Sequence, residues 1–236
     1  GGGFGNVAAK YAESFRERIK LNSKVNEINS MSLDTDNEDG DYTVVTYVDE
    51  DGNNQSAKAK TVLVTVSLGV LKEGTINFVP SLPETKQTSI DNMGFGLMNK
   101  CILSWNDEAD MVWPENELWF LLVTPKDETS GQWTRFYNPT KLKGGKPTLV
   151  AWIAGAEAWD AETQTNDEIV TAVMNNLRAM FPTISMPDSA TITRWGQNEH
   201  QRGAHTFPVA GRDIADDAAS LKETFGNIWF AGEATG

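Results

Sequence analysis

The run TVLVTV at residues 61–66 does more than any other stretch of this chain to decide the fold. It is a continuous series of β-branched and aliphatic residues, which is typical of a strand buried on both faces. Patterns typical of further strands and helices lie around it and alternate along the chain. We predict strands at 19–28, 42–48, 99–104, 119–123, 134–138, 149–154 and 191–195, and helices at 7–18, 84–92 and 167–181. Strands and helices in this order predict a mixed α/β architecture.

Short polar segments between these elements predict turns and helix ends. The sequence DEDGN at 49–53 is expected to form the turn between two strands. The acidic stretch at 34–41 is expected to be a solvated hairpin loop. Asn166 is the expected cap of the helix at 167–181, and Pro182 follows its end.

Composition limits the classes of protein to which the chain can belong. Its 236 residues, 39% of them hydrophobic, can fill the core of one large domain or two modest ones. The net charge of −13 argues against a nucleic-acid surface. Such a charge attracts cationic substrates, although solubility alone explains it equally well. Because the chain starts without Met and has no run of about 20 apolar residues, we expect a soluble piece of a longer protein.

Two patterns of chemically active residues do not fit common sites. His200 and His205 near Glu199 have a spacing that matches no common zinc pattern. The only cysteine, Cys101, excludes an internal disulfide, is compatible with a reducing intracellular compartment, and lies beside Lys100 rather than in a nucleophile motif. There is also no G-x-S-x-G motif, so the parts of a hydrolase site are absent.

The glycine-rich start of the chain fits a cofactor motif by letters alone. Residues 3–8, GFGNVA, match the dinucleotide pattern G-x-G-x-x-G/A. That pattern requires a preceding strand and an acidic residue about 20 positions later. No strand precedes these glycines in the sequence, and Glu27 lies inside a strand pattern. We therefore interpret residues 3–8 as a loop that leads into a helix.

Three further features have both a structural and a functional interpretation. Lys100 enters an apolar strand after GFGLMN at 94–99, and such a lysine is usually a snorkelling residue at the edge of a sheet. Trp195, placed on the strand at 191–195, is by default a core or rim aromatic. The sequence FAGEAT at 230–235 is a strand that runs into a tight turn, where cofactor phosphates or hydroxyls can also bind.

Taken in order along the chain, these features resemble the flavin-containing amine oxidases, which include polyamine oxidases and histone lysine demethylases. The motifs that carry the resemblance are IKLNSKV (19–25), VTVSLGVLK (64–72), FVPSLP (78–83), GFGLMNK (94–100), TRW (193–195), RG (202–203) and FAGEAT (230–235). The resemblance implies an FAD-binding amine oxidase fold. In that fold, residues 1–74 and 196–236 would be portions of a flavin-binding domain, and residues 75–195 would be a substrate domain with a mixed sheet.

The resemblance also implies roles for individual residues. Lys100 matches the family lysine that holds a water against N5 of the flavin, and is the expected catalytic residue. His205 stands where many relatives place a tyrosine of the substrate-side aromatic cage, and adds a titratable ring there. Ser67 stands where relatives often carry proline. The residues expected to bind FAD are Val25, Thr65, Trp195, Gly232, Glu233 and Thr235.

The activity that the resemblance implies is the oxidation of an amine. A hydride equivalent would pass from the amine to N5, the imine would hydrolyse, and O₂ would be reduced to hydrogen peroxide. A polyamine is the favoured substrate because the acidic chain suits a polycation. A histone lysine demethylase acting on a peptide, or a non-catalytic binding protein, are the alternatives. Since the glycine fingerprint of the family is missing from the sequence, we expect this fragment alone to bind FAD poorly and to be inactive.

Overall fold

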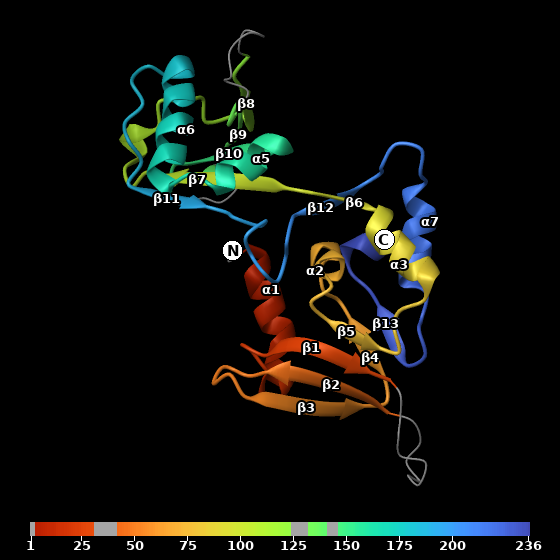
Figure 1. Ribbon diagram of the computed structural model, residues 1–236. Helices are drawn as coiled ribbons and strands as arrows, with labels where there is room; N and C mark the ends of the chain where they lie inside the picture. The colour runs from red at the N-terminus through yellow and green to blue at the C-terminus, as the bar shows by residue number, and fades with distance from the viewer. Residues whose placement is uncertain (1–2, 31–41, 124–131, 141–145) are drawn as a thin grey trace. The chain divides into compact units, whose positions relative to one another are not determined.

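The computed structural model describes residues 3–30, 42–123, 132–140 and 146–236, and the chain divides into two compact units (Figure 1). Unit 1 comprises Gly1–Gly94 and Phe207–Gly236, and unit 2 comprises Phe95–Thr206. The resemblance implies a substrate domain at 75–195, whereas unit 2 spans Phe95–Thr206. The flavin and substrate roles of the units stay predictions. The acidic stretch at 34–41 lies outside the described residues.

Unit 1 contains a four-stranded sheet in the order β3-β2-β1-β5. Strands β1 to β3 are antiparallel neighbours, and β5 joins β1 in parallel. The predicted turn between β2 and β3 is confirmed, because the carboxylate of Asp49 accepts hydrogen bonds from the N–H groups of Asp51 (3.1 Å) and Asn53 (2.9 Å). The bounds are β1 Lys24–Asn29, β2 Thr43–Val48, β3 Asn54–Ala59 and β5 Asn77–Val79.

The run at 61–66 forms a shorter and more exposed strand than its sequence predicts. Strand β4 (Val62–Val64) pairs in parallel with β13 (Ile228–Phe230), and within the described residues β13 is its only strand partner. Val64 is buried, but Leu63 is 59% exposed. The prediction of a strand buried on both faces is therefore wrong for the described residues, because the face that carries Leu63 is exposed.

Among the helices of unit 1, α3 has its predicted bounds, α2 and α7 were not predicted, and α1 begins earlier than expected. Helix α1 begins at Gly3, so the expected loop at 3–8 is wrong. Ala8, Ala9 and Lys10 are good helix formers and offset the cost of about 1 kcal/mol that a glycine adds in a helix, so the helix extends back through the glycines. The bounds are α1 Gly3–Ala12, η1 Glu13–Arg18, α2 Leu68–Glu73, α3 Glu84–Asn92, α7 Ile214–Lys222 and η3 Glu233–Thr235.

Ser67 has a structural role in this chain, at the position where the resemblance leads us to expect proline. Its side chain accepts a hydrogen bond from the N–H of Val70 and caps α2, which ends at Gly74 in the left-handed conformation (φ 66°). A serine at this position satisfies one of the free N–H groups of the first helical turn. Proline could not do so.

Unit 2 is built on a five-stranded antiparallel sheet in the order β11-β7-β10-β9-β8. Side chains from β7 and β10 pack against α6 in the core, among them Leu103, Ala151, Val173 and Leu177. The predicted strands and the long amphipathic helix are thus confirmed as a sheet with a helix on one face. The bounds are β7 Met98–Ser104, η2 Glu108–Asp110, β8 Trp119–Leu121, β9 Arg135–Tyr137, β10 Thr148–Ala154, α5 Ala156–Glu162, α6 Asn166–Met180 and β11 Ser189–Ile192.

Several ends in unit 2 differ from the prediction, and two of them involve residues named in the sequence analysis. The cap of α6 is Thr165, not Asn166, because Thr165 and Glu168 form a reciprocal capping box. Strand β11 ends at Ile192, so Trp195 lies in the turn that follows it and not on a strand.

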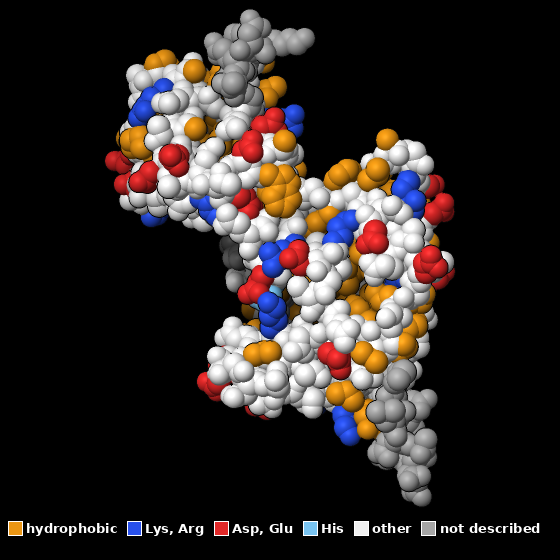
Figure 2. Space-filling model, in the orientation of Figure 1, with side chains coloured by type: hydrophobic (Ala, Val, Ile, Leu, Met, Phe, Trp, Pro, Cys, Tyr) orange, Lys and Arg blue, Asp and Glu red, His pale blue; other side chains and the backbone are white. Residues whose placement is uncertain are grey.

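Two short strands lie where the chain passes between the units: β6 (Gly94–Gly96) and β12 (His205–Phe207), which pair as a two-stranded sheet. Acidic and basic side chains are interspersed over the face of the molecule shown in Figure 2. Among the residues that the structure describes, no helix is long and apolar enough to cross a membrane.

Candidate functional site

One face of the unit 2 sheet packs on the core, and the other carries the predicted catalytic lysine. Along β7 burial alternates, with Cys101 and Leu103 fully buried and Lys100 half-buried between Asn99 and Cys101. Successive side chains of a strand point to opposite faces. Lys100 therefore lies on the face opposite the core.

Lys100 lies in a row of side chains that crosses this open face. In the sheet register Lys100 is opposite Trp152 of β10, which in turn is opposite Arg135 of β9. The Nζ atom of Lys100 lies 4.4 Å from the centroid of the Trp152 ring, where the electron-rich face of an indole attracts a cation. Since β7 has neighbours on both sides, Lys100 is not a residue of the sheet edge, and that interpretation of the sequence is wrong.

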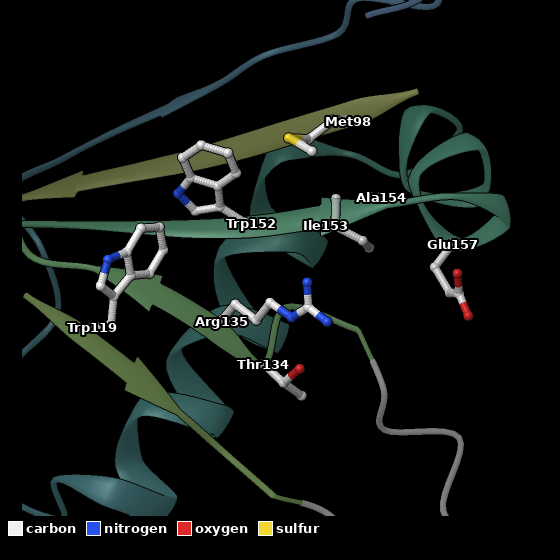
Figure 3. Close-up of a pocket in the computed structure, with 8 residues that line it drawn as sticks. All are labelled: Met98, Trp119, Thr134, Arg135, Trp152, Ile153, Ala154 and Glu157. Carbon is white, nitrogen blue, oxygen red and sulfur yellow. The ribbon is translucent and has the colours of Figure 1, made fainter. Parts of the chain in front are cut away.

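A cavity of about 430 Å³ lies on the same face of the sheet (Figure 3). Its walls combine tryptophan rings with one basic and one acidic side chain, and the rings of Trp119 and Trp152 are 5.9 Å apart. Figure 3 shows Trp119 and Glu157 at opposite ends of the view, with Arg135 between them. Mixed apolar and polar walls of this kind are typical of small-molecule sites. The lining residues are Met98, Trp119, Thr134, Arg135, Trp152, Ile153, Ala154 and Glu157.

The cavity residues were not identified from the sequence. The available signal was the aromatic content of three predicted strands, in which Trp119, Tyr137 and Trp152 stand. Only the register shows that they share a face: Trp119 is opposite Tyr137, and their rings are 4.9 Å apart. A single sequence does not give the register of strands that are far apart along the chain.

Hydrogen bonds join the strand of Lys100 to the turn of Trp195. The N–H of Lys100 donates to the hydroxyl oxygen of Thr193 (2.8 Å), and the N–H of Trp195 donates to Oδ1 of Asn99 (3.2 Å). The Thr193 hydroxyl also donates to Oδ1 of Asn99 (3.1 Å). Trp195 itself is 38% exposed. The structure thus brings two predicted site residues, Lys100 and Trp195, into one hydrogen-bonded assembly within unit 2.

Cys101, the neighbour of Lys100, has no nucleophilic role. Its side chain is fully buried in the core of unit 2. Burial raises the pKa of the Cys101 thiol to about 12, so the group stays protonated at neutral pH.

A second group of predicted site residues meets in unit 1, at the carboxyl ends of β4 and β13. The N–H of Ala231 donates to the carbonyl oxygen of Val64 (3.0 Å), which places Thr65 beside the turn that begins at Gly232. Gly232 is exposed, with φ 126°, and a Cβ built on it would meet only the carbonyl oxygen of Thr65, at 3.8 Å. The Thr235 hydroxyl donates to the carbonyl oxygen of Gly232 (2.9 Å) and holds this turn.

The residues at this edge fit the cofactor that the resemblance implies. Ligands of α/β proteins bind outside the carboxyl ends of parallel strands. The open main chain at Gly232 permits a close approach, and the exposed carboxylate of Glu233 can accept hydrogen bonds from hydroxyl groups such as those of the ribityl chain. Thr65, Gly232, Glu233 and Thr235 would therefore hold that part of FAD.

Val25 lies on the other sheet of unit 1. It is half-buried in β1, beside a register shift that leaves Asn26 without a partner on β2. Oδ1 of Asn26 is buried and has no hydrogen-bond partner among the described residues. A buried acceptor of this kind favours a ligand that donates a hydrogen bond. This is consistent with the adenine contact expected near Val25.

His205 is exposed on β12, whereas Lys100 is half-buried on β7. Its place in an aromatic cage on the substrate side stays a prediction.

Comparison with known proteins identifies the family. Residues 1–236 match the family described as flavin containing amine oxidoreductase. The chain is 32% identical over 216 residues to polyamine oxidase 4 of Oryza sativa subsp. japonica, covering 92% of this chain and 40% of that protein. It is 35% identical over 193 residues to lysine-specific histone demethylase 1 homolog 1 of Arabidopsis thaliana, covering 77% of this chain and 22% of that protein.

A solved structure supports the fold. The chain matches cyclohexylamine oxidase from Brevibacterium oxydans with a TM-score of 0.73 and 21% identity, over 98% of this chain and 47% of that one. The chain therefore spans less than half the length of each of these relatives. FAD is the cofactor that the family implies. With the whole of its sequence matched by the family, the chain belongs to the flavin-containing amine oxidoreductases.

Proposed function

We propose that the full-length protein is an FAD-dependent oxidase of a polyamine that releases hydrogen peroxide. The observation that carries the proposal is the placement of Lys100. Its ammonium group lies over Trp152 beside an aromatic cavity, and its strand is hydrogen-bonded to the turn of Trp195. A lysine held next to an aromatic site matches the residue that the family places beside flavin N5.

The residues of this chain would divide the work between holding the cofactor and preparing the amine. FAD supplies the group that accepts the hydride equivalent. Lys100 would hold a water or a positive charge beside the flavin ring, and Trp195 would pack against that ring. The cavity between Trp119 and Glu157 would orient the amine and exclude bulk water. A buried and oriented C–H bond is what this reaction requires from the protein.

The choice of a polyamine rests on charge and on one kind of relative. The chain carries a net charge of −13, which favours association with polycations. Polyamine oxidase 4 is among its relatives. The cavity itself carries Arg135 and Glu157, whose charges offset each other, so the preference comes from the whole chain.

A lysine demethylase is the second candidate, favoured by a specific comparison. The chain is 37% identical over 203 residues to histone demethylase-like protein A of Aspergillus fumigatus, covering 79% of this chain and 18% of that protein. In that case the substrate would be a methylated lysine of a peptide. A non-catalytic binding protein is disfavoured, since Lys100, Trp195 and Glu233 are all retained.

The test is peroxide release by the full-length, FAD-loaded protein. The panel comprises spermine, spermidine, their acetylated forms, an aromatic monoamine and a methyl-lysine peptide. Peroxide from the polyamines supports the proposal, and peroxide from the peptide alone selects the demethylase. A yellow protein that oxidises none of these substrates contradicts both. We further propose that the 236-residue chain alone binds FAD poorly and is inactive, which titration with FAD measures.

A further inference from the structure

Glu162, the last residue of α5, is a buried carboxylate with an unusual set of partners. Its side chain is only 6% exposed. Oε1 accepts hydrogen bonds from Nδ2 of Asn99 (2.8 Å) and the N–H of Gly196 (2.7 Å), and Oε2 accepts one from the N–H of Gln197 (2.7 Å). All of these donors are neutral amides. Burying a charge among neutral groups is costly, so these bonds must be well formed to offset the cost.

The two partners of Oε1 lie next to the two predicted flavin-side residues of unit 2. Asn99 precedes Lys100 on β7, and Gly196 follows Trp195 in the turn. A single oxygen atom therefore joins the strand that carries the lysine to the turn that carries the indole. Asn99 strengthens this connection, since its Oδ1 also accepts the N–H of Trp195 (3.2 Å).

At Gly196 the main chain of the turn lies so close to Glu162 that there is no room for a side chain. A Cβ built on Gly196 would lie 2.6 Å from a ring carbon of Trp159 and 2.9 Å from Oε2 of Glu162. No side chain fits in that space unless its neighbours move. The short N–H bond to the carboxylate therefore depends on glycine at this position.

Arg194 fixes the other side of the same turn. Its Nη1 donates to the carbonyl oxygens of Ala161 and Glu162 (both 3.1 Å), and its Nη2 donates to the carbonyl oxygen of Gln164 and to Oδ1 of Asn166 (both 2.8 Å). The main chain around Trp195 is thus held on both sides, yet the indole is 38% exposed. Such bonding does not serve to bury the ring. It fixes the main chain from which the ring projects.

We infer that Glu162 is a positioning residue that fixes Trp195 relative to Lys100. This inference rests on the proposed function for the flavin-side roles of those two residues. The hydrogen bonds themselves do not depend on it. In Glu162→Gln one carboxylate oxygen becomes an NH₂ group that faces an N–H donor, so at least one of the bonds is lost without a change of shape.

The first experiment measures the position of Trp195 without using activity. The full-length protein is labelled with 5-fluorotryptophan, and Trp195→Phe identifies the Trp195 resonance in the ¹⁹F NMR spectrum. We expect Glu162→Gln to shift or broaden that resonance and to leave those of the buried Trp113 and Trp133 in place. An unchanged Trp195 resonance in folded Glu162→Gln overturns the inference.

Two further variants control this experiment. Asn138→Ala removes another fully buried, hydrogen-bonded amide of unit 2, whose Nδ2 donates to the carbonyl oxygen of Glu117 (2.9 Å), and it should not move the Trp195 resonance. Should Glu162→Gln not fold, Gly196→Ala displaces the turn with the carboxylate intact and is expected to give the same shift. An equal shift in Asn138→Ala shows that any loss of stability moves Trp195, and contradicts a specific role of Glu162.

The second experiment measures turnover per bound FAD. We expect Glu162→Gln to lower kcat by about 10- to 100-fold, as small misplacements of reacting groups do, with little change in KM. Slow turnover in Lys100→Met together with normal kcat in Glu162→Gln overturns the inference and leaves the proposed function standing. No peroxide from the unsubstituted protein on any amine of the panel, with a shifted Trp195 resonance in Glu162→Gln, overturns the proposed function instead, while the link between Glu162 and Trp195 stands.

Discussion

Lys100 combines a structural contact with the role proposed for it. Its ammonium group packs over Trp152, and its main chain bonds to Thr193 whatever the side chain is. Methionine has a similar length and keeps the apolar stem. We therefore expect Lys100→Met to slow turnover of the full-length enzyme by at least about 100-fold, the scale at which general acid–base groups contribute, with little loss of stability. Stopped-flow absorbance of the flavin, with substrate and then with O₂, measures each half of the reaction.

Lys146→Met is the matched control for this prediction. Lys146 is an exposed lysine of the same unit, and its Nζ donates to Oδ1 of Asn106 (2.6 Å). We expect its loss to leave both half-reactions unchanged. Turnover near normal in Lys100→Met would remove Lys100 from the site, and equal slowing in both variants would point to a general effect of charge.

At the scale of elements, α3 and α7 of unit 1 are joined through a buried lysine. Lys86 of α3 is 2% exposed, and its Nζ donates to the carbonyl oxygens of Ser220 (2.8 Å), Leu221 (2.7 Å) and Glu223 (2.7 Å). Burial lowers the pKa of the Lys86 amine, but these carbonyls at the end of α7 stabilise its charge. We expect Lys86→Met to lower the free energy of unfolding by about 1 to 3 kcal/mol, because the buried carbonyls lose their donor.

Urea unfolding of Lys86→Met beside Lys72→Met checks this prediction. Lys72 is exposed, and its Nζ donates to the carbonyl oxygen of Asp91 (2.9 Å). Its loss should cost clearly less. Equal costs would mean that the contacts of Lys86 at the end of α7 add no more stability than one surface hydrogen bond.

The α7 helix also gives unit 1 an acid-sensitive contact. Asp217 is 3% exposed, and the hydrogen bond from Arg212 (Nε to Oδ2, 3.0 Å) lowers the pKa of its carboxyl group. A carboxyl whose pKa is lower in the folded state stabilises the fold above its unfolded pKa of about 3.9. That stability is lost as the pH falls through the lower folded pKa, where the folded state also takes up the proton.

We expect Asp217→Asn to be less stable than the natural chain by a constant amount above about pH 5, and by a shrinking amount below about pH 4. Thermal unfolding between pH 3 and pH 7 measures the difference. Asp216→Asn, which changes an exposed neighbour on the same helix, is the matched control. A difference for Asp217→Asn that stays constant down to pH 3 would contradict the role of the Arg212 contact.

The elements that the sequence predicted well are those with local signals. Helix α3 has its predicted bounds, and α6 is displaced by one residue because Thr165, not Asn166, can form a capping box with Glu168. Strand β4 was predicted less well. Its apolar run indicates burial, but burial depends on which elements cover it, and Leu63 is exposed in this chain.

At the scale of the whole molecule, the candidate site could also be predicted only in part from the sequence. By resemblance, the motifs identified Lys100, Trp195, Gly232 and Glu233 as site residues. The structure shows the local main-chain conformation and contacts around them. Glu162 could not be identified from the sequence, because no motif around it indicates that its side chain accepts hydrogen bonds from Asn99 and Gly196. Contacts between residues far apart along the chain depend on strand register and helix packing, which one sequence does not encode in any short motif.

The net charge of −13 on these 236 residues gives a last prediction, which is tested on the full-length molecule. If the field of the protein attracts a polycation, added salt must weaken that attraction, since charges are screened beyond about 8 Å at physiological ionic strength. We expect kcat/KM of the full-length enzyme to fall with added salt more steeply for spermine than for spermidine, and least for a monoamine. Steady-state peroxide release at several salt concentrations gives the slopes. Equal slopes for all three amines would show that the acidic surface serves solubility and has no part in substrate choice.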